Sequence, residues 1–126
     1  MQALSAGCKL EVDRGPDWLM VKVWGLEVDL ENPPALADVI WAMAQQHFTY
    51  RIVLELDQIP VLNSYLIGQL IQLYKRIRQH DGVLRLCGLS PYNRRVLRGC
   101  ALEDQFPAYA SRVEAVLGGS DPRLPR

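Results

Sequence analysis

Residues 53–89 constrain the fold more than any other stretch of this 126-residue chain. They contain an apolar strand that ends near Asp57, a helix from about Ser64 to His80, and a second apolar strand over residues 83–89. Two strands joined through one helix by short connections must pair in parallel, with a right-handed crossover. The stretch therefore predicts a βαβ unit, and residues 51–56 are expected to form a central strand of the sheet.

Segments before this unit predict an antiparallel hairpin and a helix. Residues 9–13 alternate weakly and predict a short edge strand, the turn residues 14–17 follow, and residues 18–26 are strongly β-forming. Asn32-Pro33-Pro34 favours a helix start, because Asn caps well and Pro suits the first helical position. We expect that helix to end around His47.

Segments after the βαβ unit predict two more helices. Ser90-Pro91 favours a helix over residues 92–98 that ends at Gly99, the usual glycine beyond a helix. Residues 106–110 predict a last short strand, and residues 111–117 predict a final helix stopped by Gly118.

This order of elements predicts an α/β fold. The sheet is mixed, with an N-terminal antiparallel hairpin followed by parallel βαβ strands, and about four helices pack on it. Residues 1–118 are expected to form one domain, and residues 119–126 lack apolar periodicity and are expected to be a disordered tail.

Composition narrows the choice of partners and location. Fourteen Lys and Arg balance fourteen Asp and Glu, so no overall basic field favours nucleic acid. No segment has the pattern of a secretory signal or the length of a membrane span, so we expect a cytoplasmic protein that is not embedded in a membrane.

Signatures of catalysis and metal binding are missing from the sequence. Cys8, Cys87 and Cys100 lack metal-ligand spacing, and Cys87 lies in an apolar strand where a thiol behaves as a small hydrophobe. His47 and His80 fall at predicted helix C-termini, where an imidazolium interacts favourably with the helix dipole. We therefore predict no catalytic residue, no metal, no cofactor and no enzymatic activity.

The helix that begins near Ser64 has two distinct faces. At 100° per residue its apolar side chains share an arc of less than half the circumference. That arc contains Leu66, Ile67, Leu70, Ile71, Leu73, Tyr74 and Ile77, and the opposite stripe contains Ser64, Gly68, Gln72, Lys75 and Gln79. Either Asn63 or Ser64 is suited to cap the helix, and Ser64 is also suited to accept a phosphate near the helix dipole.

Three segments carry a resemblance to a known family. Asn63-Ser64-Tyr65-Leu66-Ile67-Gly68 follows a strand that ends in Asp, and Leu86-Cys87-Gly88-Leu89-Ser90-Pro91 precedes Arg95-Val96-Leu97 and Ala101-Leu102. Upstream stands Trp24-Gly25-Leu26-Glu27-Val28-Asp29. Together they resemble the STAS domain of bacterial anti-sigma factor antagonists, over about residues 10–117.

The resemblance implies a function and a site. In that family a serine or threonine at this helix start is phosphorylated by a partner kinase, often the anti-sigma factor itself, which breaks the complex until a phosphatase restores it. Carried over, Ser64 is the candidate phosphoacceptor. The expected partner-binding surface comprises Asp57, Asn63, Ser64, Tyr65, Gly68, Gln72 and Lys75.

A second function stays open beside the first. Asn63 stands where the family has Asp, and Tyr65 and Leu66 stand where it has a small residue and a glycine. These departures also fit a non-phosphorylated STAS-like scaffold subunit of a larger signalling or transport assembly. The sequence makes no prediction about oligomeric state.

Overall fold

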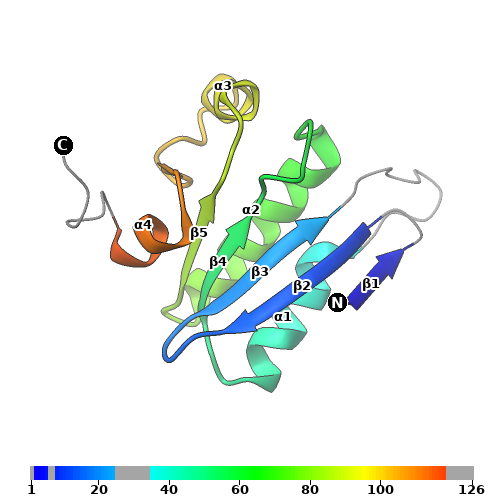
Figure 1. Ribbon diagram of the computed structural model, residues 1–126, viewed down its shortest axis with the longest axis vertical. Coiled ribbons are helices and arrows are strands. Elements are labelled where there is room, and N and C mark those ends of the chain that lie inside the picture. The colour runs from blue at the N-terminus through cyan, green and yellow to red at the C-terminus, as the bar shows by residue number, and fades with distance from the viewer. Residues whose placement is uncertain (1, 6–7, 25–34, 119–126) are drawn as a thin grey trace.

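A computed structural model describes residues 2–5, 8–24 and 35–118 of the protein. In chain order the elements are β1 (Gln2–Ser5), β2 (Cys8–Arg14), β3 (Leu19–Trp24), α1 (Leu36–Gln46), β4 (Arg51–Glu55), α2 (Ser64–Gln79), β5 (Val83–Cys87), α3 (Pro91–Gly99), β6 (Ala108–Tyr109) and α4 (Arg112–Leu117). Figure 1 shows the resulting mixed α/β fold, which confirms the predicted class and its four helices. The predicted C-terminal tail lies outside the described residues.

The strands form one sheet in the order β1-β2-β3-β4-β5-β6. Strands β1, β2 and β3 pair antiparallel, whereas β3, β4, β5 and β6 pair in parallel. This arrangement confirms the predicted hairpin, the βαβ unit and the central place of β4. The prediction that residues 9–13 form an edge strand is wrong, because β1 pairs with the outer side of β2 and takes the edge.

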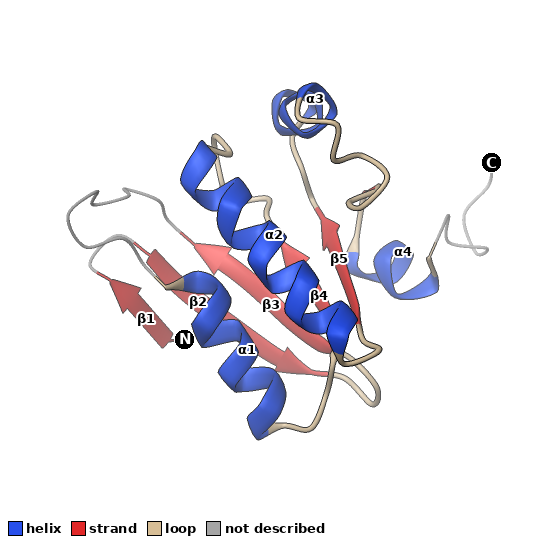
Figure 2. Cartoon of the chain, turned by 180° about the vertical axis from the view of Figure 1, so that it is seen from behind, coloured by secondary structure: helices blue, strands red, loops and turns tan. Residues whose placement is uncertain are grey.

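Helices α1 and α2 lie side by side over one face of the sheet, as Figure 2 shows, and α4 lies against the other face. The alternation of β4 explains both layers: Ile52 and Leu54 enter the main core beneath α1 and α2, while Val53 packs with Ala115 of α4. Helix α3 lies beyond the carboxyl end of β5 (Figure 1).

The predicted faces of α2 are confirmed. Leu66, Leu70, Leu73 and Ile77 are buried, whereas Ser64, Gln72, Lys75 and Gln79 are exposed. The apolar arc thus packs on the sheet, and the polar stripe that begins at Ser64 faces solvent.

Helix α1 begins later than predicted. Its N-cap is Ala35, which has no capping side chain, and the predicted cap Asn32 lies outside the described residues. Instead, the backbone N–H of Ala37 donates to Oε1 of Gln69 on α2 at 2.9 Å, and Arg76 of α2 forms an ion pair with Asp38 at 2.7 Å. The start of α1 is therefore stabilised by its neighbouring helix.

Three helices are followed, directly after the C-cap, by a residue other than glycine in the left-handed conformation. Phe48, Asp81 and Ala101 have φ of 51°, 55° and 58°, and each follows the cap of α1, α2 or α3. After α3, the N–H of Leu102 donates to the carbonyl of Leu97 at 2.9 Å, which is the 6→1 bond of a Schellman motif. The expectation that Gly99 fills this position is wrong, since Gly99 is the last helical residue and Ala101 takes the left-handed one.

Candidate functional site at the start of α2

Ser64 lies where the carboxyl ends of the parallel strands meet the start of α2. Residues 56–63 connect β4 to this helix, and α3 begins at the same end of the molecule (Figure 1). In open parallel sheets this edge is where functional groups gather, because loops from several strands converge there. The site is therefore built from the loop at residues 56–63, the first turn of α2, and α3.

Asn63, not Ser64, caps α2. Its side-chain Oδ1 accepts a hydrogen bond from the backbone N–H of Leu66 at 2.8 Å, and its backbone is extended as a cap requires. Ser64 is the first helical residue and is exposed, and no residue in the described ranges hydrogen-bonds to its hydroxyl. The hydroxyl of Ser64 is thus accessible, and the helix does not depend on it.

The loop before Ser64 is held in one conformation by Asn93 of α3. This side chain is completely buried, its Oδ1 accepts from the N–H of Leu62 at 2.9 Å, and its Nδ2 donates to the carbonyl of Ile59 at 3.0 Å. Ile59 and Leu62 also bury their side chains in the core. A buried amide that satisfies two backbone groups fixes the path of the loop, so the position of Ser64 depends on α3.

The sequence analysis missed Asn93, although a signal for it exists. Asn93 lies one helical turn before the buried Leu97, so it falls on the inward face of α3. A polar residue in phase with core residues requires a buried partner. The identity of that partner is not encoded locally, because Ile59 and Leu62 lie more than 30 residues earlier in the chain.

Asp57, the predicted acidic residue at the end of β4, is partly neutralised. The ammonium of Lys22 lies 3.3 Å from a carboxylate oxygen of Asp57 and 3.3 Å from one of Glu55. Desolvation would lower the pKa of Lys22, but its hydrogen bonds to these two carboxylates raise the pKa above its ordinary value. Gly88 passes against Asp57 with φ of +75°, and a Cβ there would lie 3.1 Å from the Cβ of Asp57.

The same ion-pair network reaches α4. Arg112 donates to Glu55 at 2.8 Å and to Asp13 at 2.9 Å. Desolvation would lower the pKa of Arg112, but the hydrogen bonds to Asp13 and Glu55 raise it. Charges of alternating sign therefore connect β2, α4, β4 and β3 to Asp57, and local sequence patterns do not reveal this network.

The remaining predicted partner-binding residues on α2 differ in position and exposure, because Gly68, Gln72 and Lys75 lie on the polar stripe and Tyr65 does not. Gln72 and Lys75 are exposed, Gly68 is half-buried, and Tyr65 is half-buried against the main core, where burial raises its pKa. Ser64 and Lys75 are separated by about 16 Å along the helix, at 1.5 Å per residue. Whether these residues contact a partner stays a prediction.

The thiol of Cys87 is not activated as a nucleophile. Cys87, at the end of β5, is buried, and its desolvation, reinforced by the carboxylate of Glu55, raises its pKa to about 12. A nucleophilic cysteine needs a lowered pKa.

Within residues 8–24 and 35–118, no cluster of His, Cys, Asp and Glu has an arrangement that would hold a metal ion.

His47 and His80 occupy the C-caps of α1 and α2, as predicted. Nδ1 of His80 lies 3.2 Å from the carbonyl oxygen of Arg76, one turn back in its own helix. Both rings therefore lie at helix ends, far from Ser64.

Among the described helices, none combines the length and the apolar character that crossing a membrane requires.

Comparison with known proteins shows which family has this architecture. The model of the STAS domain matches residues 9–115. An anti-sigma factor antagonist from Mycobacterium paratuberculosis has a similar structure, with 23% identity, a TM-score of 0.74, and coverage of 96% of this chain and 100% of that one.

Two further solved structures share the fold. A STAS domain protein from Planctomyces limnophilus is 22% identical, with a TM-score of 0.67 over 86% of this chain and 96% of that one. The Bacillus cell fate determinant SpoIIAA, solved in its phosphorylated form, is 16% identical, with a TM-score of 0.64 over 87% and 98%. Because the family model spans most of the chain and the folds agree, this protein belongs to the STAS domain family.

Proposed function

We propose that this protein is a cytoplasmic regulatory module that binds a kinase-type anti-sigma factor and is switched by phosphorylation of Ser64. It acts by binding and not by catalysis, and a phosphatase reverses the modification. The observation that carries this proposal is the geometry of Ser64: an exposed hydroxyl on the first residue of α2, with the capping role taken by Asn63. One similar structure is an antagonist solved both with and without phosphate.

The electrostatics of the helix start support a phosphate on Ser64. The first turn of α2 contains no acidic residue, so the partial positive charge of the helix N-terminus is not offset there. The nearby acidic residue Asp57 is paired with Lys22. A phosphate would be stabilised at this position in the free protein, whereas a docked partner would face a buried dianion and be released.

The bulky residues that depart from the family pattern do not cover Ser64. Leu66 is buried in the core, and Tyr65 is half-buried against it. Their side chains therefore pack toward the core, and Ser64 is exposed among the described residues. The missing carboxylate at Asn63 is the observation that favours the second candidate, a scaffold subunit that is never phosphorylated.

Phosphopeptide mapping tests the proposal directly. The protein is purified from its native cells, and the proteins that stay bound are identified in the same sample. Phosphate on Ser64 and a kinase among the bound proteins are the expected results. An unmodified Ser64 together with a stoichiometric partner that is not a kinase would favour the scaffold.

A matched pair of variants then tests the switch. Ser64→Asp should weaken binding of the retained partner at least about tenfold, because it places a charge in the contact, whereas Ser64→Ala should keep most of the affinity. Gln79→Asp, on the same exposed stripe but outside the expected partner-binding surface, controls for charge on α2 in general. Equal affinity of the Ser64→Asp and Ser64→Ala proteins would remove Ser64 from the interface.

A further inference from the structure

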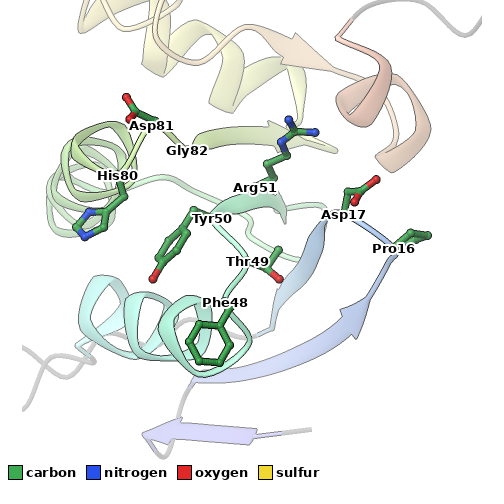
Figure 3. A pocket seen from close by; sticks show the side chains of 9 residues that line it. All are labelled: Pro16, Asp17, Phe48, Thr49, Tyr50, Arg51, His80, Asp81 and Gly82. Carbon is green, nitrogen blue, oxygen red and sulfur yellow. The ribbon is translucent and has the colours of Figure 1, made fainter.

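The end of the molecule opposite Ser64 contains a surface hollow of about 440 Å³. It lies at the amino ends of β3, β4 and β5, next to the C-termini of α1 and α2, and Figure 3 shows it from close by. The hollow is lined by Pro16, Asp17, Phe48, Thr49, Tyr50, Arg51, His80, Asp81 and Gly82. None of these residues belongs to the site at the start of α2.

Phe48 at the rim of this hollow is both strained and exposed. Its φ of 51° places a bulky side chain in the left-handed region, where glycine is preferred, and 87% of its surface is accessible. The N–H of Thr49 donates to the carbonyl of Ala44 at 3.0 Å, so Phe48 occupies the glycine position of a Schellman motif. A phenylalanine here costs conformational energy and buries little surface, so it does not serve the stability of the single chain.

One wall of the hollow is aromatic and rigid. The rings of Tyr50 and His80 stack with centroids 5.4 Å apart, and Trp41 packs edge-on against His80 at 4.6 Å. The backbone at Gly82 passes close to Tyr50, since a Cβ there would meet the carbonyl of Tyr50 and lie 2.8 Å from Cγ2 of Ile77. These contacts hold the Tyr50 and His80 side of the hollow in place.

Charges of both signs surround the hollow. Arg51 and Asp17 lie on one side of it in Figure 3, and Asp81 stands at the end of α2. Within the described ranges, none of these three side chains forms an ion pair. An unpaired cation beside unpaired anions allows this surface to pair with a second copy of itself across a two-fold axis.

We propose that two copies of this chain associate through this end, with Phe48 of each copy in the hollow of the other. Arg51 of each copy then lies against Asp17 or Asp81 of the second copy, in a two-fold arrangement. An interface built on these nine residues, with Phe48 as its aromatic anchor, buries less than the roughly 800 Å² per partner of a stable complex, so the dimer is weak. Ser64 stays accessible in both copies, so the dimer does not depend on the proposed switch.

Sedimentation equilibrium of the full chain tests this proposal between about 10 µM and about 1 mM, the range expected for so small an interface. The wild-type protein should shift from monomer to dimer across this range. Phe48→Gly should weaken the dimer at least about tenfold, because an aromatic anchor is removed, and it should fold well because glycine relieves the strain. Ala101→Gly is the matched control, since it makes the same kind of change at the equivalent position after α3 and should leave association unchanged.

A charge swap tests the orientation of the two copies. Arg51→Glu and the double variant Asp17→Arg/Asp81→Arg should each be monomeric at about 1 mM, because like charges then meet across the two-fold axis. An equimolar mixture of the two variants should form dimers again. A wild-type protein that stays monomeric throughout, a Phe48→Gly protein that dimerises as tightly as wild type, or a mixture that fails to associate would each overturn the proposal.

Discussion

The side chain of Asn93 on α3 accepts a 2.9 Å hydrogen bond from the backbone N–H of Leu62, two residues before Ser64. This bond joins two segments that are 31 residues apart and makes the loop before α2 part of the packed structure. The same amide donates to the carbonyl of Ile59, so one side chain fixes the loop at two points. The exposed Ser64 therefore stands on a rigid support.

Asn93→Ala is expected to lower the free energy of unfolding by about 2–4 kcal/mol, because two buried backbone groups lose their partner. Urea denaturation measures this change, and faster hydrogen exchange at the amide of Leu62 should accompany it. Arg94→Ala, on the exposed side of the same helix, is the control and should change stability by less than about 0.5 kcal/mol. Equal stability of the two variants would show that the loop is held by other contacts.

Asn63→Ala should destabilise the protein by about 1 kcal/mol, whereas Ser64→Ala should be nearly neutral. The reason is that only Asn63 accepts the hydrogen bond from Leu66. Thermal unfolding of the two variants side by side decides between the two capping residues that the sequence left open. A larger loss for Ser64→Ala would mean that the serine caps the helix in solution.

The contrast between α2 and α3 explains what sequence patterns can and cannot predict here. The buried face of α2 follows from the spacing of Leu66, Leu70 and Ile77, because helical periodicity is a local property. The contacts of Asn93 and the pairing of β1 with β2 join distant or weakly patterned segments, so local patterns do not reveal them. The exposed hydroxyl of Ser64 was predicted, but its rigid support was not.

Leu70→Ala should lower the free energy of unfolding by about 2–5 kcal/mol, since Leu70 is 2% exposed and its removal leaves a cavity between α2 and the sheet. Gln72→Ala, two residues later on the exposed stripe, is the control and should be close to neutral. Chemical denaturation measures both. A small effect at Leu70 would indicate that α2 is rotated about its axis.

Gly99 lies at a helical position where alanine is more favourable, and Ala101 lies at a left-handed position where glycine is more favourable. Gly99 is the last residue of α3 and a Cβ there would meet nothing within 4 Å, whereas Ala101 has φ of 58°. Gly99→Ala and Ala101→Gly should therefore each stabilise the protein, by about 0.5–1 kcal/mol, through helix propensity and relief of left-handed strain respectively. The melting temperature checks both, and Gly82→Ala is the opposite control, since its Cβ would clash with the carbonyl of Tyr50 and destabilise the fold.

The three cysteines should differ sharply in reactivity. Cys100 is exposed, whereas Cys8 and Cys87 are buried. Desolvation raises the pKa of both buried thiols above their ordinary value of 9.0, and that of Cys87 reaches about 12. Because the thiolate is the nucleophile, brief treatment of the native protein with iodoacetamide near neutral pH should modify Cys100 and spare the other two, as peptide mass spectrometry would show.

The raised pKa of Cys87 also gives a dependence of stability on pH, and its sign follows from proton binding. Between pH 9 and about 12 the folded protein holds the proton on Cys87 while the unfolded chain releases it, so stability falls as pH rises through this window. Below pH 9 the thiol of Cys87 is protonated in both the folded and the unfolded protein, so the full stability is present there. Cys87→Ala should make the decline of the unfolding free energy above pH 9 shallower than in the wild type, and an unchanged slope would show that Cys87 titrates alike in the folded and unfolded states.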